Sequence, residues 1–547
     1  MKMKLLCAAA ALSLLLTSLT ACSTGDAETS AHAGKPERTS GASTEMNTDA
    51  FAPPVDGAAQ NADTSTEPGS AGATADDTDK SENAATADDL FTNRDRDPSY
   101  DEASAVQIAL ADGATTGGAG VTVDGDTVTI TGEGVYVLTG TLTNGQVIVD
   151  ADKSVKLRLV LAGASVTNSS GAALYIRSAD KVFVTLADGT SNTLVSSGAF
   201  VQTDDNNVDG AIYSKEDLTI NGGGSLTVTS AQGHGIVGKD SVVVTGGSVT
   251  ITAAKHGVQA KDDFRMLDGA LTITSGKDGV HAANDDDESL GYIYLAGGSL
   301  TVNSEDDGIH AENYLTIEGG TIDIQKSYEG LEAKKITIDG GNIRVVASDD
   351  GVNAAGGAAG QGFGFFGRGG MNGGSSDCVL TVNGGTLSVN AGGDGVDSNG
   401  VMLISGGAVY VSGPTNAGND AVDYEMEGVI TGGTVIATGA SGMAQNFGQS
   451  STQGTMLLSV SGSAGDTITV TDENGTVLAS YTPEKAFQTA VISAPGLKAG
   501  GTYTVTVGGE ARTVQMTSTV YSEGGMGGMG GPGGMGGPGA MGGPGRR

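Results

Sequence analysis

A glycine pair recurs along the middle of this 547-residue chain at intervals close to 22 residues. The second glycine of each pair lies at position 224, 247, 298, 320, 341, 385, 407 or 433, and Asp268-Gly269 takes the place of a pair in one repeat. A short strand pattern follows each pair, with apolar and polar residues in alternation, which is the period of β-structure. A unit this short cannot bury its apolar face alone. Successive units must therefore stack as the coils of a solenoid.

We predict from this repeat an all-β chain whose body, residues 104–452, is a right-handed parallel β-helix with coils of about 22 residues. Strand patterns at 135–138, 157–161 and 182–186 predict less regular coils before the repeat. A pair of β-sandwiches is the competing architecture, but its hairpins need no fixed period. Residues 453–516 break the period and contain the turn sequence Asn474-Gly475, which predicts a small antiparallel cap over the open end of the solenoid.

The flanking segments have a different composition. Residues 1–21 carry Lys2 and Lys4, then an apolar run too short to span a membrane, which predicts an export signal. The sequence Leu19-Thr20-Ala21-Cys22 resembles a bacterial lipobox and implies lipidation of Cys22, although a simple secretory signal is the alternative. Residues 22–103 and 517–547 have few periodic apolar residues, so we predict a disordered tether and a disordered Gly/Met/Pro tail. These features together predict a lipoprotein that is anchored to the bacterial cell membrane and exposed at the cell surface.

The charge of the chain excludes some partners. It has 64 acidic and 28 basic residues, a formal charge of −36. A nucleic acid would be repelled, and a membrane is expected only through the lipid anchor. Of the three cysteines, Cys7 lies in the signal and Cys22 would be lipidated, which leaves Cys378 alone. The fold must therefore form without disulfides.

The second half of each repeat carries the candidate chemistry. Lining up sequences such as Asp306-Asp307-Gly308-Ile309-His310-Ala311 gives two columns of polar residues that should point away from the core. The turn column consists of Asp278, Asp307, Glu329, Asp350, Asp394 and Asp420. The strand column consists of His281, His310, Glu332, Asn353, Asp397 and Asp423.

Carboxylates stacked about 4.8 Å apart repel one another, and calcium with its six to eight oxygen ligands could neutralise them. We therefore predict Ca²⁺ sites at Asp278, Asp307, Glu329, Asp350, Asp394, Asp420, Glu332, Asn353, Asp397 and Asp423. The alternative is that each Asp-Gly is only a turn-forming sequence whose aspartate caps its own backbone. His234 and His256 take the turn position in earlier coils, so the sites should begin near Asp278. Zinc is not favoured at the histidines, since no Cys or HExxH pattern accompanies them.

Glycan contacts are predicted at side chains that can stack on sugar rings or hydrogen-bond to them. Tyr292 and Tyr314 occupy the same repeat position on neighbouring coils, and Tyr294 follows two residues later. A Gly/Phe-rich insertion at 356–377 adds further exposed aromatics. The candidates are His281, His310, Tyr292, Tyr294, Tyr314, Phe363, Phe365 and Phe366. For the tyrosines the alternative is an exposed β-forming residue, for the histidines an ordinary outward side chain, and for the phenylalanines an accident of low complexity.

The Gly-Gly-x-Leu-Thr-Val and Asp-Asp-Gly-Ile-His-Ala repeats, followed by residues 481–487 and 500–505, resemble the bacterial carbohydrate-binding domain-containing β-helix family. The resemblance covers roughly residues 101–509, without the Gly/Phe insertion and the tail. It implies a pectate-lyase-like fold, bound calcium, and binding of cellulose and acidic pectic polymers without clear lyase activity.

Three functions follow from these features. The first is a surface lipoprotein that binds polysaccharide in a calcium-dependent manner, where the cation links protein and polymer carboxylates. The second is a calcium-dependent pectate lyase with Lys277 or Arg344 as base, but neither lies in a recognisable catalytic pattern, so no enzyme is expected. The third is a calcium-stabilised surface rod or adhesin.

Overall fold

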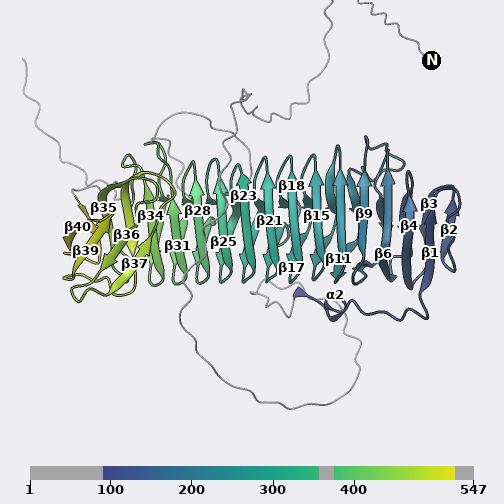
Figure 1. Ribbon diagram of the computed structural model, residues 1–547, viewed down its shortest axis with the longest axis horizontal. Coiled ribbons are helices and arrows are strands. Elements are labelled where there is room, and N and C mark those ends of the chain that lie inside the picture. Colours follow the sequence, from purple (N-terminus) through teal and green to yellow (C-terminus); the bar gives the residue numbers. More distant parts are fainter. Residues whose placement is uncertain (1–89, 357–374, 524–547) are drawn as a thin grey trace, which may run out of the picture. The chain divides into compact units, whose positions relative to one another are not determined.

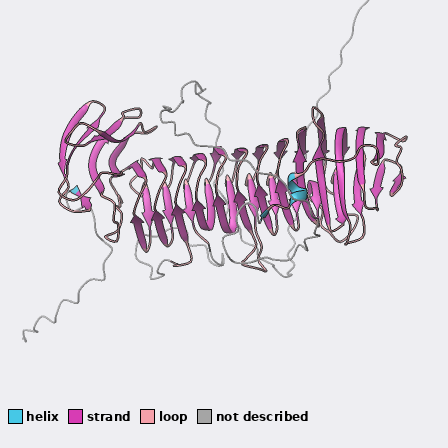
Figure 2. Ribbon diagram, turned by 90° about the horizontal axis from the view of Figure 1, so that it is seen from below, coloured by secondary structure: helices cyan, strands magenta, loops and turns pink. Residues whose placement is uncertain are grey.

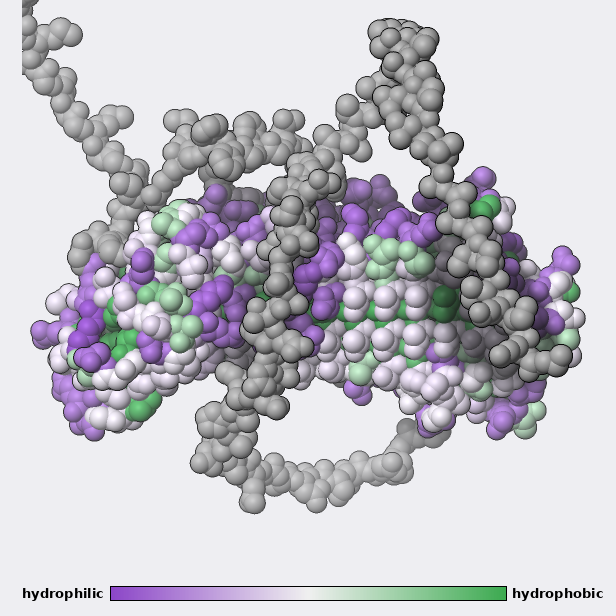
Figure 3. Space-filling model, turned by 45° about the horizontal axis from the view of Figure 1, so that its top comes forward, coloured by the Kyte–Doolittle hydropathy of each residue, from purple (hydrophilic) through white to green (hydrophobic). Residues whose placement is uncertain are grey.

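The structure is a computed structural model that describes residues 90–356 and 375–523. Strands stack side by side along a solenoid axis and form three parallel sheets, which we call A, B and C (Figure 1). Regular rows of side chains across the stack are visible in Figure 3. The predicted parallel β-helix is therefore confirmed.

Sheet A carries the strand column. Its strands are β3 (Thr127–Ile130), β5 (Gln146–Asp150), β7 (Leu174–Ser178), β10 (Gly210–Ser214), β13 (His234–Gly238), β16 (Val258–Ala260), β19 (Val280–Ala282), the first part of β22 (Ile309–Ile317), the first part of β24 (Leu331–Ile338), β26 (Val352–Ala354), β29 (Val396–Ser398) and β32 (Val422–Tyr424).

Sheet B follows sheet A in each coil. Its strands are β1 (Val106–Ala111), β4 (Val135–Leu142), β6 (Lys156–Asn168), β8 (Lys181–Leu186), β11 (Asp217–Gly222), β14 (Ser241–Val244), β17 (Asp263–Met266), β20 (Tyr292–Leu295), the second parts of β22 and β24, β27 (Val379–Val382), β30 (Val401–Ile404) and β33 (Glu427–Ile430).

Sheet C begins directly after most of the glycine pairs. It contains the end of β6, then β9 (Ser191–Ser196), β12 (Ser225–Ser230), β15 (Ser248–Ala253), β18 (Ala270–Ser275), β21 (Ser299–Ser304), β23 (Thr321–Ser327), β25 (Asn342–Ala347), β28 (Thr386–Ala391), β31 (Ala408–Ser412) and β34 (Thr434–Gly439). The hairpin of β2 (Val121–Asp124) and β3 is antiparallel and was not predicted.

The alternating pattern of the repeat places one side of every strand in a continuous core. Along sheet A the buried residues include Val280, Ile309, Leu331, Val352 and Val422, each with no exposed surface. The glycine pairs perform the turn before sheet C: Gly298 and Gly320, for example, have φ of 77° and 88°, which side chains other than glycine resist. Core and turns thus both follow from the 22-residue period.

The glycine of each Asp-Gly has a different role, because it lets neighbouring coils approach. A Cβ on Gly351 would lie 2.2 Å from Val389 Cγ1 and 2.5 Å from the carbonyl oxygen of Gly395 on the next coil. We expect Gly351→Ala to lower the free energy of unfolding by about 1–3 kcal/mol through overpacking. Gly418→Ala, whose Cβ would make only an ordinary contact of 3.4 Å with Asn416 Oδ1, should change it by less than about 0.5 kcal/mol. Equal effects of the two variants in thermal or denaturant unfolding would contradict this role.

The C-terminal cap is antiparallel, as predicted. β38 (Phe487–Ser493) pairs with the last solenoid strand, β34, on one side and with β35 (Thr455–Gly462) on the other. A separate antiparallel sheet has the order β37 (Val477–Tyr481), β36 (Ile468–Thr471), β39 (Thr502–Val507) and β40 (Glu510–Gln515). β41 (Val520–Ser522) pairs with β35, so the predicted start of a disordered tail at residue 517 is wrong.

Residues 90–97 form an ordered strap across sheet B, so the predicted disordered tether does not extend to residue 103. The strap contains the short helix α2 (Asn93–Arg96), which begins at the capping residue Thr92 and lies against the strands (Figure 2). Phe91 is 2% exposed and packs against Val243 and Tyr294 of sheet B. The strap thereby buries apolar side chains of sheet B that would otherwise face solvent.

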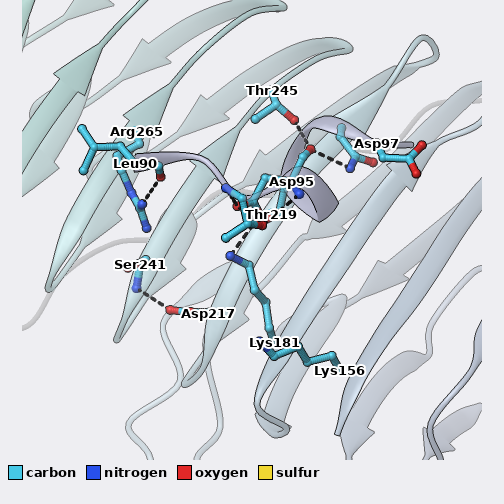
Figure 4. Close-up of polar contacts among 12 residues, drawn as sticks. Leu90, Asp95, Asp97, Lys156, Lys181, Asp217, Thr219, Ser241, Thr245 and Arg265 are labelled. Atoms are coloured by element: carbon cyan, nitrogen blue, oxygen red, sulfur yellow. Dashed lines mark hydrogen bonds and ion pairs between the residues drawn. The ribbon is translucent and has the colours of Figure 1, made fainter. Parts of the chain in front are cut away.

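Polar contacts fix the strap to five coils (Figure 4). Asp95 is fully buried, lies 3.0 Å from Lys181 Nζ and accepts a hydrogen bond from the Thr219 hydroxyl. Its carbonyl oxygen accepts hydrogen bonds from Asn221 and Thr245. At the two ends, Arg265 donates to the Leu90 carbonyl and Arg158 to the Asp97 carbonyl. These bonds join β6, β8, β11, β14 and β17 along the solenoid axis.

Several predictions concern residues outside the described ranges: the signal, Cys22, most of the tether, most of the tail, and Phe363, Phe365 and Phe366. In the described part of the chain, no helix has the length and apolar character needed to cross a membrane. Cys378 is buried and free.

Candidate functional site: two polar columns beside sheet A

The strand column is in register, as the repeat predicts. His281 pairs with His310, His310 with Glu332, Glu332 with Asn353, Asn353 with Asp397, and Asp397 with Asp423 on successive strands of sheet A. The residues on either side of each member point into the core, so the member itself points away from it. Neighbouring members are therefore one strand spacing, about 4.8 Å, apart.

The turn column is in register too, and its carboxylates bond between coils. Asp278 Oδ1 accepts the backbone N–H of Asp307 at 3.2 Å, and Asp307 Oδ1 accepts that of Glu329 at 3.1 Å. Asp350 Oδ1 accepts the N–H of Asp394 at 2.6 Å, and Asp394 Oδ1 accepts that of Asp420. Four of these residues thus receive a hydrogen bond from the next coil, which a purely local turn cap would not provide.

These hydrogen bonds occupy one oxygen of each carboxylate. The second oxygen of Asp278 and Asp307 faces other members of the columns, as in the 3.4 Å approach of His310 Nδ1 to Asp307 Oδ2. On these two coils, one carboxylate oxygen is therefore fixed by the next coil and the other faces neighbouring side chains of the columns.

The columns are more buried than outward-pointing side chains usually are. The exposed fraction is 3% for Asp278 and Asp420, 8% for Asp307 and Asn353, and 9% for Asp397. Neighbouring members cover one another, because each coil places two polar side chains side by side. The prediction that these residues face outward is correct, but five of the twelve are buried and the other seven are only partly exposed.

This burial makes ionisation of the later carboxylates unfavourable. Burial raises the pKa of Asp397 to about 8 and that of Asp420 to about 9, and the Asp423 carboxylate adds to both shifts. Burial raises the pKa of Asp394 to about 7 and that of Asp350 to about 6. A nearby cation would favour the ionised forms of all four carboxyl groups.

Glu329 and Glu332 form a second pair of carboxyl groups whose ionisation is unfavourable. Burial and the neighbouring Glu332 carboxylate raise the pKa of Glu329 far above its usual range. Burial also raises the pKa of Glu332, although His310 opposes that shift. One oxygen each from Asp307, Glu329 and Glu332 lie within 4.8 Å of one another, so the three could bind one ion together.

Two buried acceptor atoms in the columns have no hydrogen-bond partner among the described residues. They are Oδ1 of Asn353 and Oδ2 of Asp420. The amide nitrogen of Asn353 is occupied, since it donates to Glu329 Oε2 at 2.9 Å. Buried acceptors of this kind are costly unless a donor or a cation satisfies them. The oxygen-rich part of the columns, from Asp307 to Asp423, therefore fits the ligand chemistry of calcium.

The first coils are different, because nitrogen replaces oxygen there. Burial opposes the charge of Asp278, but the imidazoles of His256 and His281 outweigh it and hold the pKa of this carboxyl far below its usual range. Burial lowers the pKa of His281. The pKa of His310 is raised to about 9, because Asp307, Glu332 and Asp278 outweigh the effect of burial. His256 was not predicted as a site residue, although it takes the aspartate position of the repeat.

The predicted aromatic platform is only partly present. Tyr292 and Tyr314 are in register on sheet B, and Tyr314 is 39% exposed with Lys335 Nζ 5.4 Å from its ring centre. Tyr294 is 4% exposed, and the strap residue Phe91 covers it with ring centres 6.2 Å apart. Tyr294 is therefore not an exposed stacking residue, and that prediction is wrong.

Of the two candidate catalytic bases, Lys277 lies beside the columns and Arg344 does not. Arg344 lies on sheet C, where its Nη1 atom is 3.2 Å from Asp323 Oδ1. Lys277 directly precedes Asp278 in the turn. The proposed place of Arg344 near the polar columns is therefore wrong.

Comparison with known proteins identifies the central part of the chain. Residues 124–365 match the model of the family described as carbohydrate-binding domain-containing protein. A protein of that name from Acetivibrio thermocellus is 40% identical over 136 residues, which cover 24% of this chain and 48% of the relative. The chain thus spans about half the length of the curated relative it matches.

A solved structure shows a further likeness. It is the gadolinium derivative of a polysaccharide lyase-like protein from C. thermocellum, with 30% sequence identity and a TM-score of 0.39. The match covers 44% of this chain and 93% of that one. Residues 124–365 therefore match the carbohydrate-binding domain-containing family, which is the family that the repeat motifs resemble.

Proposed function

We propose that this protein binds an acidic or neutral plant-type polysaccharide, such as a pectic polymer or cellulose, and that calcium held by the polar columns is required. The observation that carries the proposal is the stack of carboxylates in register from Asp307 to Asp423, with the buried acceptors of Asn353 and Asp420 unsatisfied by described residues. The match of residues 124–365 to a carbohydrate-binding family supports a polysaccharide partner.

Charge explains why a cation is needed. The chain has a formal charge of −36, so a polymer of uronic acids would be repelled. A calcium ion supplies positive charge and open coordination positions that carboxylates of two partners can share. In this proposal Asp307, Glu329 and Glu332 hold the ion. Glu332, whose side chain is 23% exposed, lies at the open side, where a polymer could approach.

A calcium-stabilised rod is the second candidate, and the low exposure of the columns favours it. Ions at Asp397 or Asp420 would be almost enclosed and would mainly join coils. Polysaccharide binding and stabilisation of the rod can both occur along the polar columns. Arg344 does not support a lyase, since it is paired on another sheet and the role of a base needs a position beside the polymer.

The location of the protein is also part of the proposal. The predicted export signal and Cys22 support a lipid-anchored protein on the outside of a bacterial cell. Such a position would expose the solenoid to extracellular polymers and to calcium.

Affinity electrophoresis through gels with polygalacturonate or cellulose fragments tests this function. We expect retardation with calcium and loss of retardation with a chelator. Glu332→Gln should weaken retardation on the order of tenfold, since calcium affinity depends on the number of charged ligands. The control Glu318→Gln removes the same charge from an exposed position outside the columns and should have no effect. Retardation that persists in chelator would contradict the role of calcium, and release of unsaturated product would show a lyase.

A further inference from the structure

Four of the five histidines of the chain lie on four successive coils at the start of the polar columns. His234 and His256 take the turn position of their coils, and His281 and His310 take the strand position of theirs. Their rings follow one another with centre distances of 5.0, 4.6 and 4.9 Å. The columns thus change along the axis from nitrogen donors to oxygen donors.

Three of these imidazoles surround one carboxylate oxygen. Asp278 Oδ2 lies 2.7 Å from Nδ1 of His281, 3.2 Å from Nδ1 of His256 and 3.8 Å from Nδ1 of His310. The other oxygen of Asp278 is held by the backbone N–H of Asp307, and the residue is 3% exposed. The carboxylate is therefore fixed in one orientation, with Oδ2 directed at the imidazoles.

Polar atoms on the two coils before Asp278 are left unsatisfied by the described residues. Nδ1 of His256 is buried and makes no hydrogen bond, although Asp278 Oδ2 is close. Nδ1 of His234 is also buried without a hydrogen bond; this residue is 5% exposed and its ring stacks on that of His256. Oε1 of Gln259, whose residue is in register with His281, is a third buried atom without a partner among the described residues. Buried polar atoms without partners indicate a missing ligand at this place.

We propose that His256, Asp278 and His281 form a site for a borderline transition metal such as Zn²⁺, separate from the calcium positions. The three ligand atoms lie within 4.8 Å of one another. Tetrahedral zinc with Zn–N bonds of 2.0–2.1 Å requires ligand atoms about 3.3 Å apart, so the observed 2.7 and 3.2 Å need only small shifts. Imidazole nitrogen suits zinc, whereas calcium selects oxygen.

The proposal assigns Asp278 to the nitrogen-rich site and removes it from the predicted calcium ligands. The fourth position is taken by water or by His310, the next imidazole along the columns. The site does not rest on the proposed polysaccharide function, because it uses different ligands and a different ion.

Metal titration of the full chain after chelator treatment tests this site. We expect one equivalent of Co²⁺ to give the intense visible absorption of a four-coordinate site, and Zn²⁺ to abolish it. Excess Ca²⁺ should leave it unchanged. His256→Gln and His281→Gln should each weaken Zn²⁺ binding at least tenfold, and the control His32→Gln, outside the described residues, should not. X-ray absorption at the zinc edge should show two imidazole ligands if water takes the fourth position, and three if His310 takes it.

Three results would overturn the site: no Zn²⁺ binding by the wild-type chain, undiminished binding in both histidine variants, or displacement of the metal by Ca²⁺. Thermal unfolding without metal checks that the two variants fold. Electrophoresis on polygalacturonate with Ca²⁺ alone tests the proposed function separately, so either proposal can fail while the other stands.

Discussion

Asp95→Ala is expected to lower the free energy of unfolding by about 3–5 kcal/mol, because it leaves a buried lysine without its counter-ion. The side chains of Asp95 and Lys181 are only 1% and 5% exposed, and Lys181 Nζ lies 3.0 Å from Asp95 Oδ1. The variant would also remove the acceptor of the Thr219 hydroxyl. Denaturant unfolding of the two proteins measures the difference.

A double variant separates the loss of the ion pair from the loss of the strap. Asp95→Ala with Lys181→Met removes both charges and should recover a large part of the stability, since an apolar side chain can occupy the site of the lysine. Thr92→Ala removes the helix cap and the hydroxyl that donates to Asp95 Oδ2, but it keeps the ion pair, and it should cost about 1 kcal/mol. If Asp95→Ala alone cost no more than Thr92→Ala, the strap would not be fixed by this pair.

The melting temperature of the calcium-free protein is expected to fall as the pH rises from 6.5 to 8.5. Asp397 and Asp420 have folded pKa values of about 8 and 9, whereas an unfolded aspartate has a pKa of about 3.9. Over this range the folded state binds more protons than the unfolded state, so stability decreases with pH until the folded pKa is passed. Each such group contributes up to about 1.4 kcal/mol per pH unit.

His310 changes stability in the same direction. Its folded pKa of about 9 exceeds the ordinary value, so its contribution is complete below about pH 6.5 and is lost as the pH rises through 9. Together the three groups should lower the melting temperature by several degrees. Differential scanning calorimetry in chelator at three pH values measures this decrease.

Calcium should remove the decrease or reverse it, because the ion binds the ionised carboxylates of the folded state only. Asp397→Asn with Asp420→Asn should reduce the pH dependence in chelator and the stabilisation by calcium. The control Glu318→Gln should alter neither. A melting temperature in chelator that rises steadily to pH 8.5 would contradict the unfavourable ionisation of these carboxyl groups.

The sequence predicts the solenoid well because each coil repeats the same local pattern of strands and turns. The alternation places Ile309 and Leu331 in the core and His310 and Glu332 outside it, and the 22-residue period brings His310 and Glu332 side by side. The register of both columns follows from this period alone. The hydrogen bonds that four turn-column carboxylates accept from the next coil do not follow from the period, since they depend on the distance between successive turns.

Contacts between distant segments account for the wrong predictions. Phe91 lies about 200 residues before Tyr294, so no local pattern indicates that this tyrosine is covered. Residues 90–97 have the composition of a tether, but Phe91 and Asp95 contact sheet B and Thr92 caps the short helix that contains Asp95. His256 takes the position of an aspartate, and this substitution within the repeat is the signal that could have identified it.

Calorimetric titration with calcium tests the central claim most directly. The wild-type chain should bind calcium in the oxygen-rich part of the columns. Glu329→Gln and Asp397→Asn should each lower the number of ions bound, and the control Glu318→Gln should not. If both column variants bound as many calcium ions as the wild-type chain with the same affinity, the carboxylates would serve only to join one coil to the next.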